Sequence, residues 1–396
     1  QLRIEDIMKG DEFIGHQPEN HRWSIDEQTV LFDWNPNNEI GNSTYFWNKT
    51  SKSPQKVTTS NPMYDLDFMT TQKDYEVVYY TNQGVLYAYT KSTKKTKKVI
   101  QLADRIASVQ RSSDPNIIFF QQNRNVYQFN AKDFSIVQLT NFRTGKENKS
   151  SKEEDSFLKD QQKELFQFVR DEAKADDWYE AQSKSKKEKF PKEIFYDKSS
   201  LEQVKASPDG KFVTFRISDY PNQPSTNVEN FITADGFTRQ ERARAKVSVD
   251  NFSKHKFGIF NVVKDTTYYV SFSNLTGIKE APKYYQEYEN LKGESEYDIP
   301  VVMQSPVYSK DGKNAVLEIR SQDNKHRWMV QLDLISGKIL ELDHQHDEAW
   351  IGGPGIPGYS FGGGTLAFID NSTFYFQSEA TGFSHLSTYN LETKKK

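Results

Sequence analysis

The sequence contains no cysteine among its 396 residues. Disulfide bonds, thiolate metal sites and a cysteine nucleophile are therefore excluded. No apolar run approaches the roughly 18 residues that a membrane span requires. Basic and acidic side chains nearly balance, 52 against 55, so a surface for nucleic acid or an anionic membrane is not indicated. The sequence also lacks a phosphate-binding loop and a dinucleotide fingerprint, and we expect no cofactor.

Aromatic residues are abundant instead, with 27 Phe and 21 Tyr. Such residues favour strands, which predicts an all-β protein. A strand–turn–strand phrase also recurs along the chain. It appears as WSIDEQTVLF from Trp23, SVQRSSDPNIIFF from Ser108, KASPDGKFVTFRI from Lys205, VYSKDGKNAVLEI from Val307 and LAFIDNSTFYFQS from Leu366. Polar turn residues between alternating segments are typical of β-hairpins.

Each phrase is followed by a second hairpin, so that two hairpins form one four-stranded antiparallel sheet. Repetition at about 40 residues is typical of the blades of a β-propeller. Six units begin near residues 20, 64, 108, 203, 305 and 365. We expect residues 1–396 to form a single propeller domain, incomplete at its C-terminus, with seven to eight blades in the intact protein. A β-sandwich is the alternative, but it would not require the phrase to recur.

Two insertions lengthen the spacing between units. Residues 143–200 are densely charged, and Ser151 with Glu154 fits a capping box, which predicts a helical insertion. Residues 217–255 predict an extended hairpin or loop arm. Residues 276–304, rich in Tyr and Glu, predict a long connection between blades.

The motif Gly358-Tyr359-Ser360-Phe361-Gly362 matches the nucleophile elbow G-x-S-x-G of α/β-hydrolases. Asp370 and His385 follow in the triad order of that fold. A nucleophile elbow needs a buried strand before the serine and a helix after it. Here a Gly- and Pro-rich loop precedes Ser360 and a hairpin follows. We therefore interpret Ser360, Asp370 and His385 as a decoy and expect no catalytic residue in this chain.

Two further clusters, one of histidines and one of lysines, contain side chains that could bind a ligand. His344 and His346 form H-x-H, which places both rings on one face of a strand, but no third zinc ligand has a convincing spacing. We place them in a blade exit loop as packed or solvated histidines and predict no metal. Lys94, Lys95 and the pair 97–98 lie in a hairpin turn and edge strand, where lysines guard against aggregation.

Four phrases resemble those of a known family. FYFQSEATGFSHLSTYNLET, residues 374–393, resembles the late-blade signature SE-x-x-G-aromatic-x-H-L-Y of the propellers in dipeptidyl peptidase IV-like enzymes of the prolyl oligopeptidase family. HDEAWIGG, residues 346–353, resembles their DE-small-W phrase. ASPDGKFVTF, residues 206–215, is similar to their SPDGK blade openings, and the start LRIEDIMKGDEFIG looks like that of exported bacterial members.

The resemblance implies an α/β-hydrolase domain after residue 396, which would hold the Ser-Asp-His triad. The elbow of the family reads like GWSYGG, whereas Ser360 stands before the late-blade phrase, inside propeller sequence. In this family an inserted helix carries a Glu pair in a phrase like DW-x-YEE that binds the amino terminus of the substrate. Here the phrase reads Asp177-Trp178-Tyr179-Glu180-Ala181, so only Glu180 is left as a remnant. The family also places a propeller-loop Arg near the substrate, which makes Arg105 a position to test.

Two functional hypotheses result. The first is a substrate-gating propeller domain of an exported serine peptidase that hydrolyses short peptides, this chain alone being inactive. The alternative is a free-standing periplasmic propeller that binds a protein or glycan without enzymatic activity. Under the first hypothesis the partners are the peptide substrate and the hydrolase domain of the same polypeptide, and a homodimer is allowed. A start at Gln1 rather than Met is consistent with a removed signal peptide, hence a periplasmic or cell-surface location.

Overall fold

The computed structural model describes most of the chain. The described residues are 3–24, 28–57, 75–93, 95–146, 172, 174–179, 182, 190–222, 224–245, 252–289, 292, 297–356 and 364–396. Contacts between Cα atoms divide the chain into two compact units, residues 1–123 with 129–135 and residues 124–128 with 136–396.

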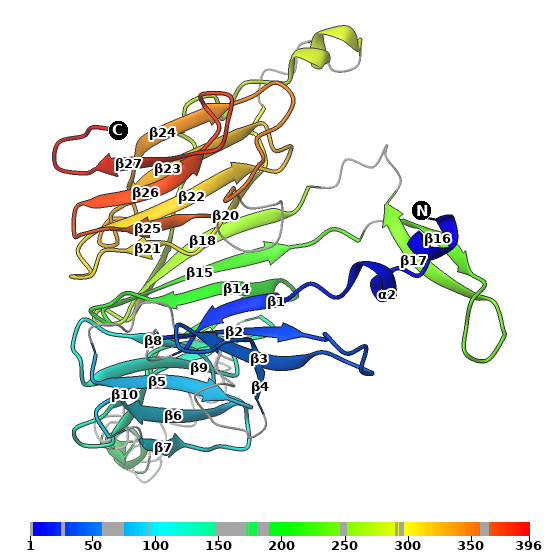
Figure 1. The fold of residues 1–396 in the computed structure, drawn as a ribbon. Helices are drawn as coiled ribbons and strands as arrows, with labels where there is room; N and C mark the ends of the chain where they lie inside the picture. Colours follow the sequence, from blue (N-terminus) through cyan, green and yellow to red (C-terminus); the bar gives the residue numbers. More distant parts are fainter. Residues whose placement is uncertain are drawn as a thin grey trace. The chain divides into compact units, whose positions relative to one another are not determined.

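The first unit consists of antiparallel sheets in which consecutive strands lie side by side (Figure 1). Two short helices, α1 (Ile4–Ile7) and α2 (Asp11–Ile14), precede them. One sheet has the order β1-β2-β3-β4 and the next β5-β6-β7, while β8 pairs with β9. The strands are β1 (Glu19–Trp23), β2 (Thr29–Trp34), β3 (Ser43–Asn48), β4 (Gln55–Lys56), β5 (Val77–Asn82), β6 (Val85–Thr90), β7 (Lys95–Ile100), β8 (Ala107–Arg111) and β9 (Ile117–Gln122). Strands β10 (Asn125–Asn130) and β11 (Ile136–Gln138) extend the last sheet to the order β11-β10-β9-β8, and the boundary between the units lies within β10.

The second unit contains three larger sheets and two pairs of strands. The sheets have the orders β14-β15-β18-β19, β20-β22-β23-β24 with β21 also on β22, and β25-β26-β27. Their strands are β14 (Ser200–Ala206), β15 (Phe212–Asp219), β18 (Lys254–Asn261), β19 (Thr266–Tyr269), β20 (Val301–Met303), β21 (Val307–Tyr308), β22 (Ala315–Ser321), β23 (His326–Leu332), β24 (Ile339–His346), β25 (Leu366–Phe368), β26 (Thr373–Ser378) and β27 (His385–Asn390).

These sheets confirm the predicted all-β fold built of propeller-type antiparallel blades. Six sheets of this type begin at β1, β5, β8, β14, β20 and β25, and five of the starts lie close to the predicted ones. The predicted start near residue 64 lies outside the described residues. Four strands per sheet is correct for three of the sheets. The β20 sheet has five because its first strand is interrupted at Gln304-Ser305-Pro306, where proline cannot donate to a ladder.

The first strand of several sheets bulges at a corresponding position. Register shifts occur in β1 before Arg22, in β8 before Gln110 and in β14 before Lys205. Each shift contains a residue with positive φ: Asn20 at 51°, Ser108 at 50° and Gln203 at 53°. A bulge of this kind inserts one unpaired residue and turns nearby side chains to a new direction.

The described parts of the insertions contain helix in one case and a strand pair in another. Residues 172, 174–179 and 182 are helical, and the ends of the 143–200 segment are joined by parallel pairing of β12 (Asn141–Arg143) with β13 (Glu193–Phe195). Strands β16 (Ser225–Asn230) and β17 (Arg239–Ala245) form the predicted hairpin arm between β15 and β18. The connection before β20 carries one 3-10 turn, η1 (Lys283–Glu287). No described helix has the length and apolar character required to cross a membrane.

The core of the second unit lies on both faces of the β20 sheet. Leu317, Ile319 and Trp328 pack with Phe257 and Ile259 of β18 on one face. On the other face, a cluster forms from Val316, Met329, Phe374, Phe376 and Tyr389. Successive residues of a strand point to opposite faces, so every residue of β22 is buried, including its charged ones.

Candidate functional site

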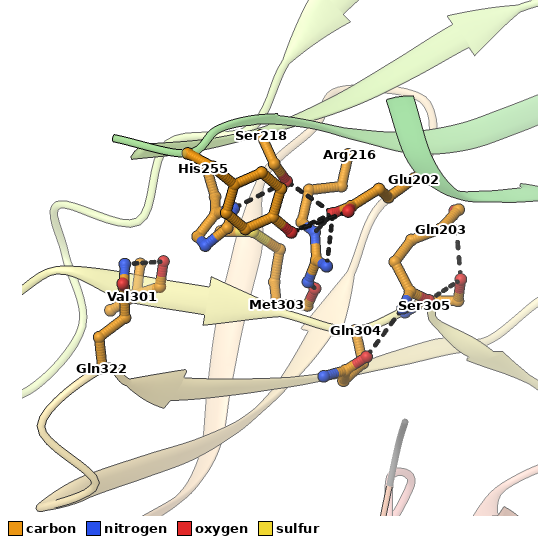
Figure 2. A network of polar contacts seen from close by, with 11 residues as sticks. Glu202, Gln203, Arg216, Ser218, His255, Val301, Met303, Gln304, Ser305 and Gln322 are labelled. Carbon is orange, nitrogen blue, oxygen red and sulfur yellow. Dashed lines mark hydrogen bonds and ion pairs between the residues drawn. The ribbon is translucent and has the colours of Figure 1, made fainter. Parts of the chain in front are cut away.

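A connected group of polar side chains in the second unit lies where β14, β15 and β18 run side by side. Figure 2 shows Glu202, Arg216, Ser218 and His255 directed toward one another. The pairing of the strands explains this, because Glu202 lies opposite Arg216 and Ser218 lies opposite His255. Alternation along β15 puts Arg216 and Ser218 on the same face.

Glu202 is the acceptor at the centre of this network. Its Oε2 accepts hydrogen bonds from Arg216 Nη2 at 2.8 Å and Ser218 Oγ at 2.8 Å, and its Oε1 accepts one from Tyr220 Oη at 2.8 Å. Burial alone would raise the pKa of Glu202, but the bonds from Arg216, Tyr220 and Ser218 outweigh it and lower the pKa. The carboxylate is therefore ionised and paired at neutral pH.

Ser218 and His255 make a second contact, 2.8 Å between Oγ and Nδ1. Burial is the main cause that lowers the pKa of His255 to about 4, and the positive charge of Arg216 acts in the same direction. The imidazole is thus neutral at pH 7. Because the Ser218 hydroxyl donates to Glu202, the Nδ1–H of His255 is the donor toward Ser218.

A serine, a histidine and a carboxylate are in contact here, but their hydrogen bonds are not arranged as in a catalytic triad. In a catalytic triad the carboxylate orients the imidazole, and the imidazole takes the serine proton. Here the carboxylate of Glu202 holds the serine, and His255 donates to it. Ser218 is also fully buried, so no substrate carbonyl can reach its oxygen. This arrangement positions side chains and does not supply a nucleophile.

The same network joins the β14 sheet to the β20 sheet. Arg216 Nη1 donates to the Met303 carbonyl oxygen at 2.6 Å, and Gln203 Nε2 donates to Gln304 Oε1 at 3.0 Å. Ser305 donates through its hydroxyl to Gln203 Oε1 at 2.8 Å. The bulge at Gln203 directs its amide toward the interruption between β20 and β21 (Figure 2).

A second set of bonds lies beside the base of the arm. Gln322 Nε2 donates to the Ser253 carbonyl oxygen at 2.6 Å, and Ser253 N–H donates back to Gln322 Oε1 at 3.0 Å. His255 and Tyr220, which flank the arm in sequence, contact each other edge to face at 6.1 Å between ring centroids. The arm therefore starts and ends at residues held by the Glu202 network.

The structure separates two members of the Ser360 motif group. Asp370 lies in the turn before β26, where its Oδ1 accepts the N–H groups of Ser372 at 2.8 Å and Thr373 at 2.6 Å. His385 begins β27 and pairs with Ser378, the last residue of β26. The two side chains are thus at opposite ends of a six-residue strand, roughly 17 Å apart at about 3.4 Å per residue. Ser360 itself lies outside the described residues.

The proposed substrate contacts are only partly visible. Glu180 lies outside the described residues, and its neighbours Trp178 and Tyr179 are exposed on the helical segment with their rings edge to face. Arg105 is exposed in the loop between β7 and β8 of the first unit. Its side chain covers Gly84, whose φ of 81° and lack of a Cβ allow the close approach. These positions stay predictions.

The H-x-H pair, His344 and His346, lies in a strand and not in a loop. The expected exit loop is wrong, because β24 continues through His346 and places His344 opposite Trp328 and His346 opposite His326. His326 Nδ1 lies 3.0 Å from His344 Nε2, and both rings stack with Trp328. Among the residues that the structure describes, no group of three His, Asp or Glu side chains has the arrangement of a metal site. Lys95, at the start of the exposed strand β7, lies on the outer strand of its sheet as expected.

Sequence reasoning missed the Glu202 network. A detectable signal was present in FVTFRISD, where Arg216 and Ser218 follow Thr214 at a spacing of two in a largely buried strand. Two polar residues on one face of a buried strand require partners. The identity of those partners depends on strand pairing, which the sequence of β15 does not contain.

No protein-family model and no curated protein matches the sequence. Similar solved structures include dipeptidyl peptidase 4 of Porphyromonas gingivalis, with a TM-score of 0.47 and 12% identity over 98% of this chain. A Bacteroides ovatus protein assigned as a dipeptidyl aminopeptidase IV has a TM-score of 0.43 and 12% identity over 95% of this chain. This chain spans 47% and 43% of the lengths of those two proteins.

Proposed function

We propose that this chain is the substrate-gating propeller region of an exported serine peptidase of the dipeptidyl peptidase IV-like type. Peptide bonds of short peptides would be hydrolysed by a Ser-Asp-His triad in a separate α/β-hydrolase domain of the same polypeptide. The propeller would restrict access to that triad and supply groups that select the substrate. Residues 1–396 alone would then be inactive.

One contact carries this proposal. The two phrases that most resemble the family, HDEAWIGG and SEATGF, meet in the structure, because Gly352 N–H donates to Glu379 Oε2 at 3.2 Å. The approach is close, since a Cβ on Gly353 would overlap the Glu379 carboxylate. The glycines and the glutamate of the two phrases therefore form one structural unit at the end of β26.

Selection of substrates by their free amino terminus would fall to Glu180. An ammonium group and a carboxylate form a strong, charge-assisted hydrogen bond when they are partly removed from water. The position follows two exposed aromatic residues, Trp178 and Tyr179, on the described part of the inserted helix. Arg105 would lie near the substrate.

The proposal is tested with residues 1–396 and with the longer gene product, side by side. Chromogenic Xaa-Pro and Xaa-Ala dipeptides should be hydrolysed by the longer product and not by residues 1–396. The variant Ser360→Ala of the longer product should retain full activity. Activity of residues 1–396 that disappears in Ser360→Ala would contradict the proposal. Inactivity of both proteins would favour the free-standing binding module.

The role of Glu180 has its own test in the longer product. Glu180→Gln should raise KM about tenfold or more for peptides with a free amino terminus, since one charged hydrogen bond is worth roughly 1.5–3 kcal/mol. Glu172→Gln, at a described helical position of the same 143–200 insertion, serves as the matched control. An equal change in both variants, or an equal effect on N-acetylated peptides, would assign Glu180 to the solvated surface.

A further inference from the structure

Two arginines face each other inside the second unit, between the β20 sheet and the β25 sheet. Arg320 of β22 and Arg327 of β23 are direct cross-strand partners. Their side chains share the face of Val316 and Met329, which packs on Phe374 and Phe376 of β26. Arg320 is 5% exposed and Arg327 is 0% exposed. Like charges directly opposite each other in a sheet destabilise it unless another group compensates them.

A single carboxylate partly compensates this pair. Glu318, two residues before Arg320 on the same face, accepts a bond from Arg327 Nε at 2.7 Å and is 1% exposed. Two guanidinium groups and one carboxylate leave one net positive charge in the buried cluster. Burial lowers the pKa of Arg320, the charge of Glu318 raises it and that of Arg327 lowers it.

The other partners of the arginines are neutral. Arg320 Nη2 donates to the Ile351 carbonyl oxygen at 2.8 Å and to Asn324 Oδ1 at 3.3 Å. Arg327 Nη1 donates to the Gln377 carbonyl oxygen. Nε and Nη1 of Arg320, Nη2 of Arg327 and Oε2 of Glu318 are buried without a hydrogen-bond partner in the described part of the chain. Three guanidinium nitrogens therefore retain a free N–H.

A buried charge without a counter-charge strongly destabilises the folded protein. A water molecule would satisfy the hydrogen bonds but would leave the charge uncompensated. Glu379, whose carboxylate accepts the Gly352 N–H at 3.2 Å, forms no ion pair with either arginine among the described residues, where Arg327 pairs with Glu318. The surrounding side chains, Val316, Met329, Phe374 and Phe376, are fully buried and apolar, which excludes a bulky ligand.

We propose that Arg320 and Arg327 bind a small monovalent anion of the size of chloride or formate between these two sheets. The anion accepts the free N–H groups of both arginines and cancels the net charge of the cluster. The site is independent of the proposed peptidase activity. Its occupancy would stabilise the packing of β22 and β23 against β26.

The first experiment is an anion titration of residues 1–396, with thermal unfolding as the readout. Chloride or formate replaces gluconate at constant ionic strength and pH 7. An anion that binds only the folded state raises the unfolding midpoint in a saturable way. We expect a rise of several degrees with chloride and formate and none with gluconate. A midpoint that does not depend on the anion would show that water alone occupies the cluster and would overturn the proposal.

Variants locate the effect. Arg320→Met removes the excess charge and two of the free N–H donors, so its midpoint should no longer respond to chloride. Arg239→Met, on the exposed arm, should respond as the unmodified chain does. An unchanged response in Arg320→Met would exclude this site. If Arg320→Met does not fold, anomalous diffraction from crystals of the unmodified chain grown in bromide replaces this test. An anomalous peak between the two guanidinium groups supports the proposal, and the absence of a peak overturns it.

Discussion

Ser218 and His255 lie directly opposite each other on β15 and β18, with 2.8 Å between Oγ and Nδ1. The contact belongs to a network that converges on Glu202 and does not create a nucleophile. The network has a structural role, because it fixes both ends of the β16–β17 arm and links two sheets through Met303. The free energy of unfolding, and its dependence on pH, should therefore change when this network is altered.

Removal of the central charge should destabilise the protein. Glu202→Gln leaves Arg216, whose side chain is 9% exposed, without its counter-charge. We expect a loss of about 1.5–3 kcal/mol in the free energy of unfolding, the usual value of a charged hydrogen bond. Urea unfolding at pH 7 measures it. Glu193→Gln is the control, because its pair with Arg143 is half exposed and should contribute less than about 1 kcal/mol. Equal losses in the two variants would contradict a special role for Glu202.

Stability should fall as the pH decreases from 6.5 to 4.5. Burial lowers the pKa of His255 and of His326 from 6.5 to about 4 in the folded protein. The unfolded chain then binds more protons in this window, so the stabilisation present above pH 6.5 is lost toward pH 4. Each histidine contributes at most about 1.4 kcal/mol per pH unit, and partly exposed His255 less.

Urea midpoints at pH 4.5, 5.5 and 7 measure this slope. His255→Asn and His326→Asn should each reduce it, whereas His385→Asn, at an exposed position, should not. Glu202 and other carboxylates with a lowered pKa lose their contribution only below about pH 4.5, so they do not interfere. An identical slope in all four proteins would refute the assignment to the buried histidines.

Gly258 on β18 tests the packing between neighbouring strands. A Cβ at this position would overlap the ring of Phe215, which is fully buried. Gly258→Ala should therefore cost about 1–3 kcal/mol or more through overpacking. Gly41→Ala has open space around its Cβ and should change stability by less than about 1 kcal/mol. Thermal unfolding of both variants measures the two effects. If Gly258→Ala leaves the stability unchanged, Phe215 can move aside.

The separation of Asp370 from His385 leads to a prediction for the longer gene product. Asp370→Asn and His385→Gln should leave kcat within about twofold of the unmodified enzyme, because neither residue can act on the other. Loss of a true triad member lowers kcat by about 10⁴-fold or more. Steady-state kinetics on an Xaa-Pro substrate distinguishes the two cases. A fall of that size in either variant would return the Ser360 group to the active site.

Local pattern was sufficient to predict the blades. Segments such as LAFIDNSTFYFQS place turn residues between short alternating runs, and the hairpin of β25 and β26 forms there, with Asp370 binding the turn. The arm at residues 217–255 was predictable for the same reason. The loop expected around His344 was wrong, because pairing with β23 extends β24 through polar residues that a sequence pattern assigns to a turn.

The all-β class, the repeated unit and the interruptions of the repeat could be predicted from the sequence, since hairpins depend on residues that are close in the chain. The meeting of polar side chains could not be predicted, because it depends on which strands pair. Glu202 contacts Arg216 and Ser218, Arg320 lies opposite Arg327, and Asp370 is separated from His385. Register and sheet order select these neighbours, and both follow from the burial of whole faces and not from any local motif.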